Sequence, residues 1–182
     1  MVEIFDVGEV IQKLEAYRNG KLDIRFNRPS PLCELSNLWP RRFKFRGLEC
    51  NSIEGVLASL FAPTWKREEI VKLSGFEAFY AIDGFRVRNF MFFDGYIDRF
   101  SKEYGDFLYD LYYSAFSQCD FSKEILVTTS KFDIELVHSV GKSGKQNTIL
   151  TESEYITTLN NVRMQLTGDE YEEEGILNFG RD

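Results

Sequence analysis

The chain has 182 residues, of which 43% are hydrophobic and 15% aromatic, so it is long enough for one domain with a substantial core. Its net charge of -7 argues against a dedicated nucleic-acid-binding protein, but a few local cations would be enough to hold a pyrophosphate. The first residues are acidic where a signal peptide is basic, and no apolar run approaches about 18 residues, so we expect neither export nor membrane insertion.

The cysteines and the histidine bear on compartment and metal binding. Cys33, Cys50 and Cys119 are widely spaced and odd in number, which indicates reduced thiols and a cytoplasmic protein. The chain has one histidine and neither a CxxC nor an HxxxH motif, so we expect no metal site. We expect no other cofactor.

The first third of the chain mixes short helices and strands. Apolar spacing predicts a helix over residues 7–18, and alternation predicts a strand over 22–26. The segment FKFRGLEC indicates a hairpin that turns at Arg46 and Gly47. Ser52 is a good N-cap for a helix over 53–61.

The middle of the chain continues this mixture. After the break at Pro63, Thr64 is expected to cap a helix that ends at Gly75, and a further helical segment covers 76–82. The aromatic segment NFMFFDGYID predicts a hairpin that turns at Asp94 and Gly95.

The last third contains the longest predicted helices. Ser101 is expected to cap a helix over 102–118, and a short helix is expected over 122–127. Residues 134–140 form the best internal strand. A capping box that starts at Thr151 opens a helix running to about residue 166.

This order of elements favours an α+β fold, mostly helical with short strands and hairpins, because no regular βαβ alternation is present. We expect one domain over residues 1–167. Residues 168–182 are expected to form an acidic flexible tail.

Generic catalytic motifs are missing from the sequence. Residues 141–143 read GKS, but the glycine that a P-loop requires five positions earlier is Leu136. Neither GxGxxG nor GxSxG occurs.

Two polar clusters remain as candidates for chemistry. The first joins LSNLWP at 35–40 to NSIEG at 51–55, with Glu54 in the first turn of a predicted helix. An acid there also completes an ordinary helix cap, and Asn37 also suits a turn. Taken alone, this cluster leaves both interpretations open.

The second cluster is HSVGKS at 138–143, where a strand runs into a loop hinged by glycine. Backbone N–H groups and a lysine at such a strand end suit a phosphate. An ordinary surface loop with a solvated Lys142, and a hydrogen-bonded core histidine at His138, are equally simple interpretations.

Together and in order, these segments resemble the NADAR (YbiA-like) family. LSNLWPRRFKFRGLECNSIEG is similar to the family's N-terminal signature, and YIDRFSKEY and LVHSVGKSGKQNTILTESEYITTLNNVR are similar to its later segments. The resemblance covers roughly residues 22–166. It implies an α+β fold with a pocket between the helix that Ser-x-Glu opens and the C-terminal loop.

The resemblance also implies roles for particular residues. Ser36 and Asn37 would help line the pocket, and Glu54 would be the principal acid. The far wall would comprise His138, Ser139, Gly141 and Lys142, with Lys142 near a phosphate. Trp39 or a phenylalanine would stack on a flat base.

The implied activity is that of a hydrolase, an N-glycosidase acting on a ribosylated ligand. Family activities include removal of ADP-ribose from modified guanine and splitting of early riboflavin-pathway intermediates. Cleavage leaves positive charge on the ribose carbon, which a carboxylate such as Glu54 can stabilise. The implied partners are ADP-ribose-like or ribosylated molecules, and ADP-ribosylated nucleic acid.

One position departs from the family pattern. The family helix usually carries a lysine two turns after the glutamate, and here that position is Phe61. Lys66, beyond the break at Pro63, is the amine that could fold back toward Glu54. Without an amine, the chain would use Glu54 alone on water or bind its ligand without turnover. A protein-interaction domain that uses the acidic tail is a further alternative.

Overall fold

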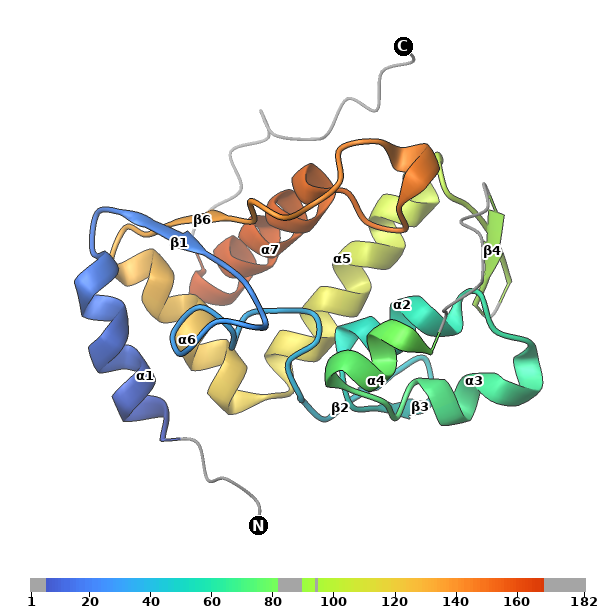
Figure 1. Ribbon diagram of the computed structural model, residues 1–182, viewed down its shortest axis with the longest axis horizontal. Coiled ribbons are helices and arrows are strands. Elements are labelled where there is room, and N and C mark those ends of the chain that lie inside the picture. Colours follow the sequence, from blue (N-terminus) through green and yellow to red (C-terminus); the bar gives the residue numbers. More distant parts are fainter. Residues whose placement is uncertain (1–5, 82–89, 94, 169–182) are drawn as a thin grey trace.

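The computed structural model describes residues 6–81, 90–93 and 95–168 (Figure 1). Within them the fold is α+β and mostly helical, as the sequence predicts, and the strands form three two-stranded sheets. None of the helices in these ranges combines the length and the apolar character that a bilayer crossing requires.

Two long helices form the centre of the fold. Helix α5 (Lys102–Ser117) packs against α7 (Glu152–Thr167), and α6 (Asp120–Lys131) packs against both. The buried side chains of α5 recur every three or four residues, which gives the helix one core-facing side. These side chains are Tyr104, Phe107, Leu108, Leu111, Tyr112, Ala115 and Phe116. The N-caps predicted for α5 and α7, Ser101 and Thr151, are confirmed, and α7 has the full capping box.

A parallel strand pair joins an early segment of the chain to the segment that precedes α7. Strand β1 (Lys21–Asp23) pairs with β6 (Glu135–Val137), and Figure 1 shows the two side by side beyond α1 (Val7–Leu14). A short 3-10 helix, η1 (Glu15–Tyr17), follows α1. The pairing brings the segment after β1 next to the predicted loop after β6, which includes His138.

The first hairpin leads into three short helices. Strands β2 (Phe43–Phe45) and β3 (Leu48–Cys50) are antiparallel and turn at Arg46 and Gly47, as the sequence predicts. Helices α2 (Ile53–Ser59), α3 (Thr64–Ile70) and α4 (Gly75–Tyr80) follow and lie together in Figure 1.

The second hairpin precedes α5. Strands β4 (Phe90–Phe92) and β5 (Tyr96–Asp98) are antiparallel, as predicted, although Asp94 of the predicted turn lies outside the described residues. Residue 82, the predicted end of the helical segment that α4 represents, and most of the predicted tail (169–182) also lie outside them.

Some predicted boundaries are wrong. Thr64 is the first residue of α3 instead of its cap, because Pro63 takes the capping position, and α3 ends at Ile70 well before Gly75. Helix α6 is longer than the predicted 122–127, and β6 is shorter than the predicted 134–140. Tertiary packing decides these ends, which local propensity fixes poorly.

Candidate functional site

A pocket of about 480 Å³ lies between helix α2 and the segment that joins β6 to α7, which contains the 3-10 helix η2 (Lys145–Asn147). It draws residues from the loop before β2, from α2, α4 and α7, and from the loop after β6. The lining residues are Ser36, Asn37, Leu38, Glu54, Leu57, Phe61, Phe79, His138, Val140, Gly141, Lys142, Asn147, Thr148, Ile149, Leu150, Thr151, Glu152 and Tyr155. The two polar clusters noted in the sequence therefore meet across one cavity.

The start of α2 fixes the position of Glu54. The Ser52 hydroxyl accepts from the Gly55 amide at 2.9 Å and donates to the Leu73 carbonyl at 2.7 Å. The Glu54 amide donates to the Asn37 carbonyl at 3.0 Å, which ties the loop before β2 to this helix. A Cβ on Gly55 would lie 2.8 Å from the Leu73 carbonyl oxygen, so only glycine allows this close packing.

The carboxylate of Glu54 has an unusual environment. Burial raises its pKa to about 7 from an ordinary value of 4.5. Among the described residues, no hydrogen bond or ion pair reaches this carboxylate. A carboxyl group that titrates near neutral pH and faces a cavity can both accept and donate a proton there.

Three buried tyrosines surround Glu54 but donate their hydroxyl hydrogens elsewhere. The hydroxyl of Tyr112 donates to Asn37 Oδ1 at 2.6 Å, and those of Tyr104 and Tyr155 donate to backbone carbonyls. Burial is the main cause that raises the pKa of each tyrosine, and the nearby Glu54 charge raises it further. Glu54 therefore keeps its lone pairs for a ligand or water.

The Asn37 side chain is oriented by its hydrogen bond to Tyr112. Because Oδ1 accepts from Tyr112, the Nδ2 amide group is the part of Asn37 that remains to donate to a ligand. Behind this loop, the buried Arg41 guanidinium donates from Nη2 to the carbonyls of Glu34 and Ser36, both at 2.9 Å. The loop that presents Ser36 and Asn37 is thus held from inside the core.

His138 reaches the pocket from the end of β6. Its Nδ1 lies 2.7 Å from the Ile24 carbonyl oxygen, so Nδ1 carries the hydrogen in the neutral ring and Nε2 is an acceptor. The ring packs edge-on against Tyr155 with centroids 5.0 Å apart. His138 is therefore hydrogen-bonded and packed against Tyr155, as the simpler interpretation of the sequence predicts, and it also lines the pocket.

The loop after His138 packs tightly on the start of α7. A Cβ on Gly141 would lie 2.6 Å from Glu152 Cβ and 3.0 Å from its Cα, so glycine is required by this close approach. The Glu152 amide donates to the Lys142 carbonyl at 3.1 Å. This contact sets the exposed Lys142 at the pocket, where its cation can meet an anionic ligand group.

Three residues predicted for the site lie elsewhere. Trp39 is 7% exposed in the core, stacked on Phe121, because the loop before β2 folds inward there. Ser139 does not line the pocket, and its amide and hydroxyl donate to Asp23 at 2.9 and 2.7 Å. Lys66 is exposed on α3 beside Trp65 and does not line the pocket, because α3 turns it outward.

Phe61, the residue at which the resemblance led us to expect an amine, lines the pocket. Leu57 and Phe79 line the pocket as well, so its lining combines apolar side chains with the polar groups of Asn37 and His138. Apolar side chains suit the face of a flat ring.

Residues 147–151 and Tyr155 also line the pocket, which the sequence does not predict. The capping box at Thr151 is visible in the sequence, but it indicates only where a helix begins. Within the described residues, no group of three or more His, Cys, Asp or Glu side chains is placed to hold a metal ion.

The fold is similar to that of the E. coli protein YbiA, whose structure was determined by NMR. The two share 16% sequence identity with a TM-score of 0.57, and the match covers 85% of this chain and 91% of YbiA. The resemblance to the YbiA-like family that the motifs carry is thus confirmed in the fold. No curated protein matches the sequence.

The sequence itself matches the family described as Bacteriophage protein GP30.3 over residues 29–164. This range includes every lining residue of the pocket. Because the match covers most of the sequence, the chain belongs to the Bacteriophage protein GP30.3 family.

Proposed function

We propose that this protein is an N-glycosidase that hydrolyses the bond between a ribose carbon and a base nitrogen, with Glu54 as its catalytic carboxylate. One observation carries the proposal: Glu54, which has no partner among the described residues and a pKa of about 7, faces a pocket of about 480 Å³. The resemblance to the NADAR family supports the same reaction.

In the proposed reaction, a water oxygen attacks the ribose C1′ while the bond from C1′ to the base nitrogen breaks. The bonding electron pair leaves with that nitrogen, and the water proton passes to the Glu54 carboxylate. The negative charge of Glu54 also stabilises the positive charge that develops on the sugar. Neither a metal nor an amine is needed to balance this step.

The remaining lining residues fit the parts of such a ligand. Asn37 Nδ2 can donate to a ribose oxygen, and His138 Nε2 can accept from a ribose hydroxyl. Lys142 can pair with a phosphate, and apolar lining side chains such as Phe61 suit the leaving base.

The ligand class that follows is an ADP-ribose-like or ribosylated molecule, including an ADP-ribosylated base within nucleic acid. The net charge of -7 favours recognition of one modified nucleotide over binding along a polynucleotide. We assign the protein to the cytoplasm because all three of its cysteines are unpaired.

Phe61 favours a second candidate, a module that binds an ADP-ribose-like ligand without cleaving it. The pocket has a phenylalanine where the family pattern has an amine, so a family mechanism that uses this amine cannot run here. Calorimetry with ADP-ribose, combined with a turnover assay, separates the two. Micromolar binding without any product supports the binding module, and product formation excludes it.

The direct test incubates the purified protein with ADP-ribosylated guanosine, with ADP-ribosylated DNA and with the riboflavin-pathway intermediate. We expect one of them to be cleaved, with release of ADP-ribose from the first two substrates or of the free base from the third, and Glu54→Gln to slow release by about a hundredfold or more, the usual contribution of a general base. Glu49→Gln, a change to an exposed strand residue, is the matched control and should leave the rate unchanged. Absence of product from all three substrates would reject the proposal.

A further inference from the structure

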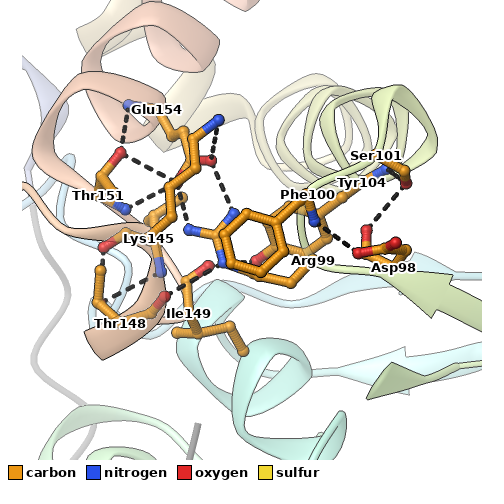
Figure 2. Close-up of polar contacts among 11 residues, drawn as sticks. Asp98, Arg99, Phe100, Ser101, Tyr104, Lys145, Thr148, Ile149, Thr151 and Glu154 are labelled. Carbon is orange, nitrogen blue, oxygen red and sulfur yellow. Dashed lines mark hydrogen bonds and ion pairs between the residues drawn. The ribbon is translucent and has the colours of Figure 1, made fainter. Parts of the chain in front are cut away.

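A buried ion pair lies behind the wall of the pocket that faces α2. Arg99 follows β5 directly and is 1% exposed, and Glu154 is in the first turn of α7. Arg99 Nη1 donates to Glu154 Oε1 at 2.8 Å and Nη2 to Oε2 at 2.6 Å, which is a two-pronged pairing of planar groups (Figure 2). Neither residue lines the pocket.

Both partners also bind the backbone of the wall itself. Arg99 Nε donates to the Thr148 carbonyl at 3.2 Å, and Glu154 Oε2 accepts from the Thr151 amide at 2.9 Å and from its hydroxyl at 3.0 Å. Between these points, the Tyr104 hydroxyl donates to the Ile149 carbonyl. Residues 148–151 all line the pocket, so three consecutive attachments hold one lining segment from behind (Figure 2).

The guanidinium is itself held in a fixed orientation. The Arg99 guanidinium carbon lies 4.6 Å from the centroid of the Tyr104 ring, on the helix that crosses the centre of the fold. Arg99 thus links three parts of the molecule: the end of β5, helix α5 and the pocket wall with the start of α7. A lysine could supply the charge, but it has neither the planar fork nor a second donor group for Thr148.

Stability alone is a weak reason for this arrangement. Removing two charges from water costs as much as a buried pair typically returns, so apolar residues of similar volume would often serve equally well. The start of α7 is already capped by Thr151 and Glu154 without Arg99. The additional effect of Arg99 is to fix the position of residues 148–151, which line the same pocket as Glu54.

We propose that Arg99, through Glu154, is a positioning residue that sets the 148–151 wall in the geometry the ligand requires opposite Glu54. The effect on turnover that we expect from this positioning rests on the proposed function. Displacing a reacting group by about 1 Å typically costs about a hundredfold in rate, so a wall held at three points matters for turnover.

The test compares Arg99→Lys, which keeps the charge but loses the fork, with Glu154→Gln, which can still cap α7 because glutamine also serves in a capping box. Lys102→Met is the matched control, since it breaks an exposed ion pair on α5 outside the pocket. Far-ultraviolet circular dichroism and thermal unfolding establish that each variant is folded before other comparisons are made.

For the folded variants we expect kcat to fall at least tenfold in Arg99→Lys and Glu154→Gln. The pH midpoint of the rate should stay near that of the wild type, because Glu54 is intact. Lys102→Met should match the wild type in both respects. If Arg99→Lys has wild-type kcat and KM, the charge alone is sufficient and the positioning role is rejected.

A second measurement does not depend on catalysis. The amides of Leu150 and Thr151 donate to Thr148 Oγ1 and Glu154 Oε2, and their hydrogen exchange should be at least tenfold faster in Arg99→Lys than in the wild type and in Lys102→Met. Unchanged exchange at these amides overturns the proposal whether or not the protein cleaves any substrate. Faster exchange in a protein without N-glycosidase activity would reject the proposed reaction while retaining the role of Arg99 in ordering the wall.

Discussion

At the scale of single residues, Glu54 makes the protein less stable as its carboxyl group ionises. Its pKa is about 7 in the folded protein against 4.5 when free, so the folded state holds the proton more tightly. Stability is therefore fully present below pH 4.5 and falls as the pH rises toward 7. At pH 8 the cost is about 3 kcal/mol, from 1.36 kcal/mol for each pH unit between the two pKa values.

Glu54→Gln should therefore raise the free energy of unfolding by up to about 3 kcal/mol at pH 8 and change it little at pH 4. Urea denaturation of both proteins at the two pH values measures this difference. An equal effect at pH 4 and pH 8 would mean that Glu54 does not ionise in a buried environment.

Gly141→Ala tests the close contact between the loop after β6 and the start of α7. The new Cβ would lie 2.6 Å from Glu152 Cβ, so the loop must shift, at a cost of about 1–3 kcal/mol. We expect weaker binding of ADP-ribose by calorimetry, because Lys142 moves with the loop. Gly144→Ala, whose Cβ would meet only side-chain atoms at 3.3 Å or more, should change both quantities less.

At the scale of secondary-structure elements, helix α2 carries the proposed catalytic group, and its N-cap fixes it to its neighbours. Ser52→Ala removes the bonds to the Gly55 amide and the Leu73 carbonyl, and should destabilise the protein by about 1–2 kcal/mol. It should also lower kcat, because Glu54 lies two residues further along the same turn.

The comparison for Ser52→Ala is Asp6→Ala, which removes the side-chain cap of α1 outside the pocket. We expect a similar loss in thermal unfolding experiments but unchanged kcat. If both variants lose activity in proportion to stability, the cap of α2 has no special relation to the site.

The elements that the sequence predicts well are those with local signals. The caps at Ser52, Ser101 and Thr151 and the turn at Arg46 and Gly47 lie next to the residues they organise, and all of them are confirmed. The ends of α3 and α6 depend on packing between distant segments. No local pattern marks such ends.

At the scale of the whole molecule, the pocket exists because segments far apart in the sequence meet. The resemblance to the NADAR family implies one shared site, and six of the nine residues predicted for it line the pocket: Ser36, Asn37, Glu54, His138, Gly141 and Lys142. Trp39 and Ser139 were included by their place in the same motifs. Side-chain direction, which a motif does not encode, turns them away.

Lys66, the lysine predicted to replace the missing amine, is also turned away from the pocket by a feature that a motif does not encode. Lys66 follows Pro63 and could have folded back toward Glu54, but α3 continues outward and leaves it exposed. The role of Arg99 was invisible in the sequence for a related reason. Its partner Glu154 lies 55 residues away, and only the packing of α5 on α7 brings the two together.

The pH dependence of kcat/KM for release of ADP-ribose from ADP-ribosylated guanosine tests the central claim most directly. Because Glu54 must be ionised to take the water proton, kcat/KM should rise between pH 5 and pH 9 with a midpoint near its pKa of about 7. Glu54→Gln should be slower by about a hundredfold or more at pH 8 and lack this inflection. A wild-type profile without an inflection near 7, or a Glu54→Gln variant as active as the wild type, would contradict the assignment of Glu54.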